Sequence, residues 1–258
     1  MSPCLVAYGR CGEEFERPPE TKRVGRFLLL WWVMISLGRS WFYLTTRERR
    51  CLRWVTVIIG AIRVRLADVM DDAGRAGICS QVAKMVAGYR ATWTGLTRGR
   101  HLVGHTWRGV IEIDLRRHIA PGGHCAATLV SMGVSDAPLV RDERLLVVHT
   151  HMVLDGTDGV ADDDAVGEAW ADRVRAVLRG AWPGAWRTLI KGLRADQTVR
   201  MAVTKLYGYA HKRRLQYAHD STGWGDIPTA YGDHYERPWA AMIEEAYAGI
   251  TIELRSRR

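Results

Sequence analysis

The segment LLVVHTHMVLDG, residues 145–156, places two histidines one residue apart inside an apolar run. Side chains two residues apart on a β-strand point to the same face, with Cα atoms about 7 Å apart, so the imidazoles of His149 and His151 can converge on one cation. The same two histidines also fit polar interruptions of a core strand, because an isolated H-x-H pattern often arises by chance. A metal site therefore needs a further ligand from elsewhere in the chain.

The segment VIEIDL, residues 110–115, supplies a candidate for that ligand. Its residues alternate, so Glu112 and Asp114 share one face and three apolar side chains share the other, as in a half-buried strand. No crossover helix is recognisable between this strand and the histidine strand, so we expect the two to pair antiparallel. Glu112 is the preferred third ligand and Asp114 the less favoured alternative. Two imidazoles and one carboxylate would leave positions open for water and substrate, as a catalytic metal site requires.

A third pattern lies in KLYGYAHKRRLQYA, residues 205–218. On a helix, Tyr209 and Lys212 share a face because they are three residues apart, and Lys205 lies one turn back on the same side. A tyrosine hydroxyl with a pKa of about 10 is a poor nucleophile at neutral pH. A metal-polarised phosphodiester and a nearby ammonium would offset this weakness. Taken alone, the pattern also fits a core aromatic beside a solvated lysine.

Composition favours a polyanionic partner. The 258 residues include 37 Lys and Arg against 28 Asp and Glu, which gives a formal charge of +9. Such a surplus favours nucleic acid, although many basic proteins bind none. The five cysteines are scattered without a CxxC pair, so neither a disulfide framework nor a zinc ribbon is expected, and a reducing cytoplasm is the expected compartment. The apolar run at residues 27–37 is 11 residues long, about half of a membrane span, so we predict a buried strand or core segment and no membrane partner.

The order of these patterns predicts an α+β domain with a mostly antiparallel sheet and helices packed on it. We expect an N-terminal arm at residues 1–24, a catalytic domain at 25–220 and a C-terminal extension at 221–258 that holds a short helix. Periodicity predicts further strands at 41–46 and 186–191. It also predicts four helices: from Glu48 to Val69, from the acidic turn at 155–164 to Gly180, from Thr198 to Tyr217, and from Pro238 onward. The segment DDAGRAG, residues 71–77, should close the first helix, and residues 78–106 should form a short helix and a loop.

Four segments, in order, resemble the rolling-circle replication initiators of the HUH endonuclease superfamily, particularly plasmid and phage Rep proteins with one catalytic tyrosine. FYLTT at 42–46 is similar to the first motif, usually written FLTLT, and GVIEIDL at 109–115 to the strand that often precedes the histidines in such initiators. VVHTHMVL at 147–154 resembles the metal-binding motif, and YAHK at 209–212 the tyrosine motif Y-x-x-K. The likeness covers roughly residues 25–217.

This resemblance implies an HUH, ferredoxin-like nuclease fold and a metal-dependent enzyme that nicks and rejoins one strand of an origin. Tyr209 would attack the scissile phosphate to give a 5′-phosphotyrosine and a free 3′-OH, and Lys212 would steady the phosphate or the metal site. His149, His151 and Glu112 would hold Mg²⁺ or Mn²⁺. Single-stranded origin DNA would be the partner, gripped by arginines and some of the tryptophans. A separate helicase is expected because the chain has no visible P-loop.

The sequence departs from the family pattern in three respects. Thr150 replaces the bulky apolar residue that usually separates the histidines, and Tyr207 is a second tyrosine, without a lysine three residues on. Only Cys4 and Cys11 remain of a cysteine-rich zinc segment that some members carry, so no zinc is expected. A relaxase or transposase of the same superfamily, a small-molecule metal hydrolase and a non-catalytic basic DNA-binding protein are the alternatives. Motif order disfavours a relaxase, and the spacing around the histidines disfavours a hydrolase.

Overall fold

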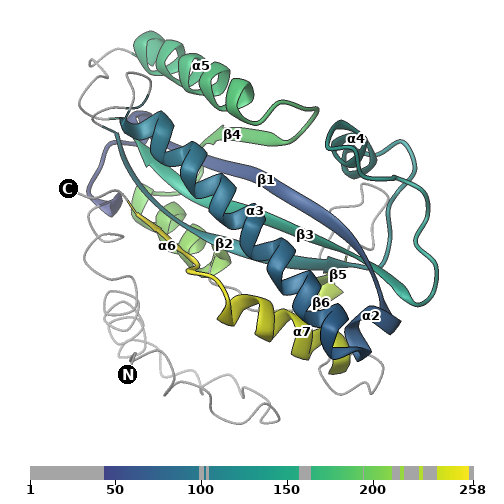
Figure 1. The fold of residues 1–258 in the computed structure, drawn as a ribbon. Coiled ribbons are helices and arrows are strands. Elements are labelled where there is room, and N and C mark those ends of the chain that lie inside the picture. The colour runs from purple at the N-terminus through teal and green to yellow at the C-terminus, as the bar shows by residue number, and fades with distance from the viewer. Residues whose placement is uncertain are drawn as a thin grey trace, which may run out of the picture. The chain divides into compact units, whose positions relative to one another are not determined.

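A five-stranded antiparallel sheet forms the centre of the fold, as Figure 1 shows. The computed structural model describes residues 44–98, 102, 105–156, 164–193, 195–210, 216–217, 227–228 and 237–255, all within a unit that spans Arg39–Arg258. The strand order is β4-β1-β3-β2-β7, and every neighbouring pair is antiparallel. The strands are β1 (Leu52–Arg65), β2 (Thr106–Arg116), β3 (Glu143–Asp155), β4 (Thr188–Gly192) and β7 (Glu253–Arg255). The predicted α+β class with an antiparallel sheet is confirmed.

The histidine strand is the middle strand of the sheet. β3 pairs with β1 on one side and with β2 on the other, and all 13 of its residues are buried. The predicted antiparallel pairing of the carboxylate strand with the histidine strand is therefore confirmed. Burial on both faces explains why the sequence of β3 reads as a nearly continuous apolar run rather than as clean alternation.

One face of the sheet is covered by α3 (Asp72–Arg98), α5 (Asp164–Ala181) and α7 (Arg237–Ala248). The helix α3 begins where the Asp71 carboxylate accepts a hydrogen bond from the backbone N–H of Gly74 at 2.7 Å, as an N-cap does. Its buried side chains recur at helical spacing: Ile78, Val82, Val86, Tyr89 and Trp93. Each such side chain contributes roughly 1.5–3 kcal/mol on burial, which together outweighs the cost of about 1 kcal/mol for each glycine in the helix.

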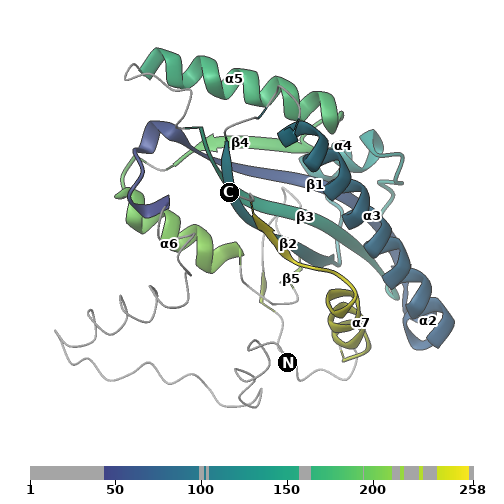
Figure 2. The ribbon, with the colours of Figure 1, turned by 60° about the vertical axis from the view of Figure 1, so that its left-hand side comes forward.

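The opposite face, which carries the histidines, has two helices over it. The short helix α4 (His124–Ser131) packs Cys125, Ala126 and Leu129 against Ile58, Leu145 and Val147. Helix α6 (Val199–Ala210) contacts β2 and β3, and Figures 1 and 2 show it on the side of the sheet away from α3. This face is called the histidine face below.

Smaller elements complete the described part of the chain. The 3₁₀ helix η2 (Arg49–Cys51) precedes β1, and the short helix α2 (Leu66–Met70) follows it. A two-stranded ribbon joins β5 (Gln216–Tyr217) to β6 (Ile227–Pro228). Within the described residues, no helix has the length and apolar character needed to cross a membrane.

The helix predicted from Glu48 to Val69 is wrong, because residues 52–65 form β1. A bulge between Ile58 and Gly60 shifts the strand alternation by one residue. The shift introduces one three-residue step, from Ile59 to Ile62, into the two-residue period of the side chains that face the core. That step makes the apolar pattern resemble a helical stripe. The rich content of β-branched residues was the sequence signal that favoured a strand.

The strand predicted at 41–46 is wrong where the structure describes it, and several predicted boundaries also differ. Leu44 and Thr45 of the predicted strand at 41–46 are helical, with the Arg47 N–H donating to Leu44 O at 3.4 Å, and residues 41–43 lie outside the described part. The segment at 71–77 opens α3 rather than closing a helix, and α3 extends to Arg98 in place of a short helix and loop. The helix predicted to reach Tyr217 ends at Ala210.

Other predicted elements are confirmed. The strand predicted at 186–191 is β4, the helix predicted to end at Gly180 is α5, and the helix predicted to begin near Pro238 is α7. The predicted arm at 1–24 and the apolar run at 27–37, predicted to be a buried strand or core segment, lie outside the described residues. The described cysteines, Cys51, Cys79 and Cys125, are free thiols, whereas Cys4 and Cys11 lie outside the described residues.

Candidate metal centre

Glu112, His149 and His151 meet on the histidine face. The strand register sets Glu112 directly opposite His149 and Val110 directly opposite His151. Glu112 Oε2 lies 3.2 Å from Nε2 of His149 and 3.2 Å from Nε2 of His151. One ligand atom from each residue lies within 4.8 Å of the other two, and all three side chains are buried. The group can therefore hold a metal ion.

The two contacts of Glu112 Oε2 have lengths that ligands of a single cation can have. Two ligands that each lie about 2.1 Å from a divalent ion are about 3.0 Å apart at a right angle and about 3.4 Å apart at the tetrahedral angle. The two contacts of Glu112 Oε2, at 3.2 Å each, fall between these values. Three protein ligands leave at least one coordination position for water or a substrate oxygen.

The electrostatics of the group also suit a metal. Burial opposes ionisation of Glu112, but the hydrogen bonds and charges of His149 and His151 outweigh it and lower the pKa of Glu112 from 4.5 to about 2. Burial lowers the pKa of His151 below its usual value. At neutral pH the site therefore holds a carboxylate beside a neutral His151 imidazole, and these are the protonation states that ligate metals.

His149 differs from His151 because a second carboxylate lies beside it. Burial tends to lower the pKa of His149, but Asp114 and Glu112 outweigh burial and raise the pKa. Asp114 Oδ2 lies 3.7 Å from His149 Nδ1 and accepts a hydrogen bond from Arg116 Nη2 at 2.7 Å. Asp114 thus faces the ring nitrogen that points away from Glu112. The less favoured ligand of the sequence interpretation is placed to orient His149 rather than to share its cation.

Thr56 on β1 gives His151 a comparable support. Thr56 lies directly opposite His151 in the strand register, and its Oγ1 is 3.0 Å from His151 Nδ1. When the threonine oxygen accepts the Nδ1–H, the lone pair of Nε2 is left facing Glu112. The Trp54 ring stacks on His151 with centroids 5.1 Å apart and further fixes the imidazole plane. Neither residue was identified from the sequence, because the helix predicted for this segment hid their strand alternation.

Thr150, between the two histidines, points to the other face. It is fully buried, and its Oγ1 lies 3.5 Å from the hydroxyl of Tyr89 on α3. A buried tyrosine hydroxyl needs a polar partner. The departure from the bulky apolar residue of the family motif therefore has a local cause, because Thr150 supplies that partner.

The residues of the predicted tyrosine motif lie on or just beyond α6. Tyr209 is part of this helix, which contacts β2 and β3 on the histidine face. The side chains at 205–210, which include Lys205, Tyr207 and Tyr209, lie outside what the structure describes, as does Lys212. The helix on which the sequence placed the nucleophile is thus on the same face as the candidate ligands.

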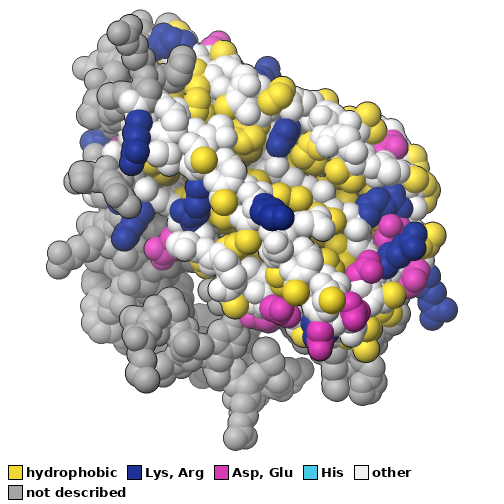
Figure 3. All heavy atoms as spheres, viewed as in Figure 1, with side chains coloured by type: hydrophobic (Ala, Val, Ile, Leu, Met, Phe, Trp, Pro, Cys, Tyr) yellow, Lys and Arg dark blue, Asp and Glu magenta, His cyan; other side chains and the backbone are white. Residues whose placement is uncertain are grey.

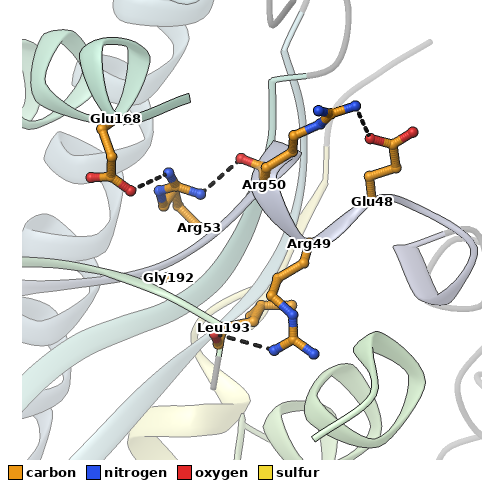
Figure 4. Close-up of a pocket in the computed structure, with 7 residues that line it drawn as sticks. All are labelled: Glu48, Arg49, Arg50, Arg53, Glu168, Gly192 and Leu193. Carbon is orange, nitrogen blue, oxygen red and sulfur yellow. Dashed lines mark hydrogen bonds and ion pairs between the residues drawn. The ribbon is translucent and has the colours of Figure 1, made fainter. Parts of the chain in front are cut away.

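A separate pocket of about 460 Å³ contains none of the three ligands. Figure 4 shows that its arginines already have protein partners. Arg49 donates to Leu193 O at 3.4 Å, Arg50 pairs with Glu48 at 2.6 Å, and Arg53 pairs with Glu168 at 3.0 Å. These contacts connect η2 and β1 with α5 and with the end of β4, so the pocket is primarily a structural junction.

The charge on the α3 side is mixed. Figure 3 shows scattered Lys and Arg side chains separated by apolar and neutral surface, with acidic side chains gathered towards α2 and α7. A continuous basic track for a polyanion is not visible on this side of the described residues.

Comparison of the chain with protein-family models, with curated proteins and with solved structures finds no match.

Proposed function

We propose that the protein initiates rolling-circle replication by nicking and rejoining single-stranded origin DNA through a covalent tyrosine intermediate. One observation carries the proposal: the buried group of Glu112, His149 and His151 lies on a face of an antiparallel sheet that is also contacted by the helix bearing Tyr209. A core histidine pair alone would require neither a convergent carboxylate nor a tyrosine helix over it. The formal charge of +9 supports DNA as the partner.

In the proposed reaction, the phenolic oxygen of Tyr209 attacks the phosphorus of the scissile phosphodiester. The new Tyr–O–P bond forms as the P–O3′ bond breaks, the phenolic proton passes to a base, and the departing 3′ oxygen takes up a proton to become a free 3′-OH. Rejoining is the reverse transfer to a 3′-OH. The proposal gives Lys212 the role of holding the phosphate for in-line attack.

The three metal ligands serve the same step. A divalent cation such as Mg²⁺ or Mn²⁺ would stabilise negative charge on a non-bridging phosphate oxygen. Glu112 supplies the negative charge that attracts the cation, and the neutral His151 imidazole supplies a lone pair. Thr56 is within hydrogen-bond distance of His151, and Asp114 places a second carboxylate beside His149. Duplex opening would come from a separate helicase of the host or the replicon.

A covalent-adduct assay tests the proposal. The protein is incubated with Mn²⁺ and single-stranded DNA from the replicon that encodes it, and adducts are resolved on a denaturing gel. We expect an adduct that disappears in Tyr209→Phe and persists in the matched variant Tyr207→Phe. An adduct of undiminished yield in Tyr209→Phe would show that the nucleophile is another residue.

The metal ligands are tested in the same assay. His149→Ala and His151→Ala should abolish the adduct while single-stranded DNA binding and the circular dichroism spectrum are retained. The contrary outcome has two parts: both histidine variants unfold, and the isosteric Glu112→Gln folds and still forms the adduct. In that case the group is structural and the proposed metal mechanism is wrong.

A further inference from the structure

We infer that Trp186 and His124 form a stacking platform for an unpaired base of single-stranded DNA; the identity of this ligand rests on the proposed function. The two rings are stacked, with centroids 3.8 Å apart and planes inclined by 17°. The Trp186 residue is nevertheless 55% exposed, so much of it remains accessible to solvent beside the contact with His124. Base stacking on an exposed aromatic ring is a common mode of single-strand recognition that tolerates any sequence.

The backbone at Trp186 is strained. Its φ is 58°, and among the described residues no other non-glycine residue has a positive φ. A bulky side chain is disfavoured in this left-handed region of backbone conformation, which glycine and asparagine adopt more readily. Residues held in such conformations gather at binding and catalytic sites. Because Trp186 is largely exposed, burial of its side chain offsets little of this backbone strain. A binding role for the ring would explain why a tryptophan stands here.

The residues before and after Trp186 in the chain are held by contacts with the surrounding structure. Arg187 O accepts a hydrogen bond from Ile58 N at 2.8 Å, and the Arg187 guanidinium donates to the carbonyl oxygens of Ile58 and Ile59, each at 3.0 Å. On the preceding side, Gly184 has a φ of 132°, and a Cβ there would lie 2.4 Å from Ser131 Oγ. The loop thus lies tightly against α4 and the β1 bulge, and it presents the Trp186 ring in a set orientation.

The platform lies on the histidine face. His124 is the first residue of α4, which packs on that face through Cys125 and Leu129. Ile58, to which Arg187 is bonded, is directly opposite His149 in the sheet. Adjacent strands are about 4.8 Å apart, so two strand spacings, or about 10 Å, separate the backbone at Arg187 from that at His149. The platform and the candidate ligands therefore lie on the same face, within the span of a few nucleotides of one strand.

Binding of uniform oligonucleotides, in which every position is equivalent, tests the platform. Dissociation constants are measured by fluorescence anisotropy, in EDTA and at fixed salt, for a short oligothymidylate and for a fully abasic oligomer of the same length. The ratio of the two constants reports the contribution of the bases. We expect Trp186→Leu to weaken oligothymidylate binding by about tenfold, the magnitude of one lost stacking contact, and to leave binding of the abasic oligomer unchanged.

Two further variants separate stacking from folding. Trp186→Phe should retain most of the base contribution, because a smaller ring still stacks. Trp186→Gly should lose the base contribution while its thermal melting temperature is equal to or above that of the wild type, because glycine relieves the positive φ. Wild-type affinity of Trp186→Gly for oligothymidylate, or equal weakening of the abasic oligomer by Trp186→Leu, would overturn the inference.

This measurement is independent of nicking, because it requires neither Tyr209 nor a divalent cation. A Trp186-dependent base contribution without any covalent adduct would support the platform and overturn the nickase. An adduct with no Trp186-dependent base contribution would support the nickase and overturn the platform.

Discussion

Glu112 and His149 face each other directly across β2 and β3, with Glu112 Oε2 3.2 Å from His149 Nε2. The same oxygen lies 3.2 Å from Nε2 of His151. One buried carboxylate oxygen therefore joins two imidazoles from the middle strand of the sheet. Because the strands on both sides of β3 fix its backbone, the three ligand atoms are positioned by sheet register rather than by a loop. Sites on rigid elements hold their geometry more closely than sites on loops.

Replacing Glu112 by glutamine should remove metal binding without unfolding the protein. Glutamine keeps the size of the side chain and can still hydrogen bond to the imidazoles, but it lacks the negative charge. We expect the affinity for Mn²⁺ to fall by more than about 100-fold, since loss of an outer-shell partner alone costs 10- to 100-fold. Isothermal titration calorimetry measures the effect, and unchanged affinity would exclude Glu112 as a ligand.

Thr56→Val should weaken metal binding by about tenfold while leaving the fold intact. Valine has nearly the same shape as threonine but cannot accept the hydrogen bond from His151 Nδ1, which lies 3.0 Å from the threonine oxygen. The imidazole then loses the partner that selects its tautomer. Thr56→Ser is the matched control and should restore most of the affinity. Equal affinities for the valine and serine variants would show that the hydroxyl does not act on His151.

Tyr89→Phe should destabilise the protein by about 1 kcal/mol, because it leaves the buried Thr150 hydroxyl without this partner. Thr150→Val should cost a similar amount, and the double variant should be less destabilised than the sum of the two. Urea unfolding of the four proteins gives the coupling free energy. Strict additivity would mean that the 3.5 Å contact contributes nothing to stability.

Glu143→Gln should reduce stability at neutral pH and make it less sensitive to acid. The Arg63 guanidinium donates to both Glu143 oxygens, at 2.9 and 2.6 Å, and its hydrogen bonds lower the pKa of Glu143 against the effect of burial. A lowered carboxylate pKa contributes stability above the ordinary value of 4.5, which is lost as the pH falls through the lowered pKa.

We expect the glutamine variant to lose about 1–2 kcal/mol at neutral pH, since one partner of a charged bidentate pair is neutralised. The difference from the wild type should shrink as the pH is lowered below 4.5. Urea unfolding across this range measures it. A difference that stays constant with pH would mean that the pair does not shift the titration of Glu143.

The sequence determined those parts of the fold in which burial follows a simple period. The alternation in VIEIDL and LLVVHTHMVLDG was enough to predict β2 and β3 and to put Glu112 on the face of the histidines. Their antiparallel pairing was predicted because no crossover helix was recognised between them; the pairing is confirmed, although the helix α4 lies between the two strands in the sequence. By contrast, the bulge between Ile58 and Gly60 broke the period of β1, and glycines along α3 hid a long helix whose stability comes from its buried side. Local patterns fail where tertiary packing outweighs propensity.

The sequence by itself thus identified His149, His151 and the preferred third ligand Glu112, because strand period indicates which side chains share a face, although Asp114 on the same face stayed an alternative. Only the tertiary structure decided how those ligands are supported. Thr56 reaches His151 because β1 pairs with β3. Asp114 lies beside Nδ1 of His149 because it follows Glu112 by two residues on the same face of β2, which pairs Glu112 with His149. Trp186 meets His124 although 61 residues lie between them in the sequence, where no period relates them. Register and long-range packing are set by the whole sheet, and short stretches of sequence do not encode them.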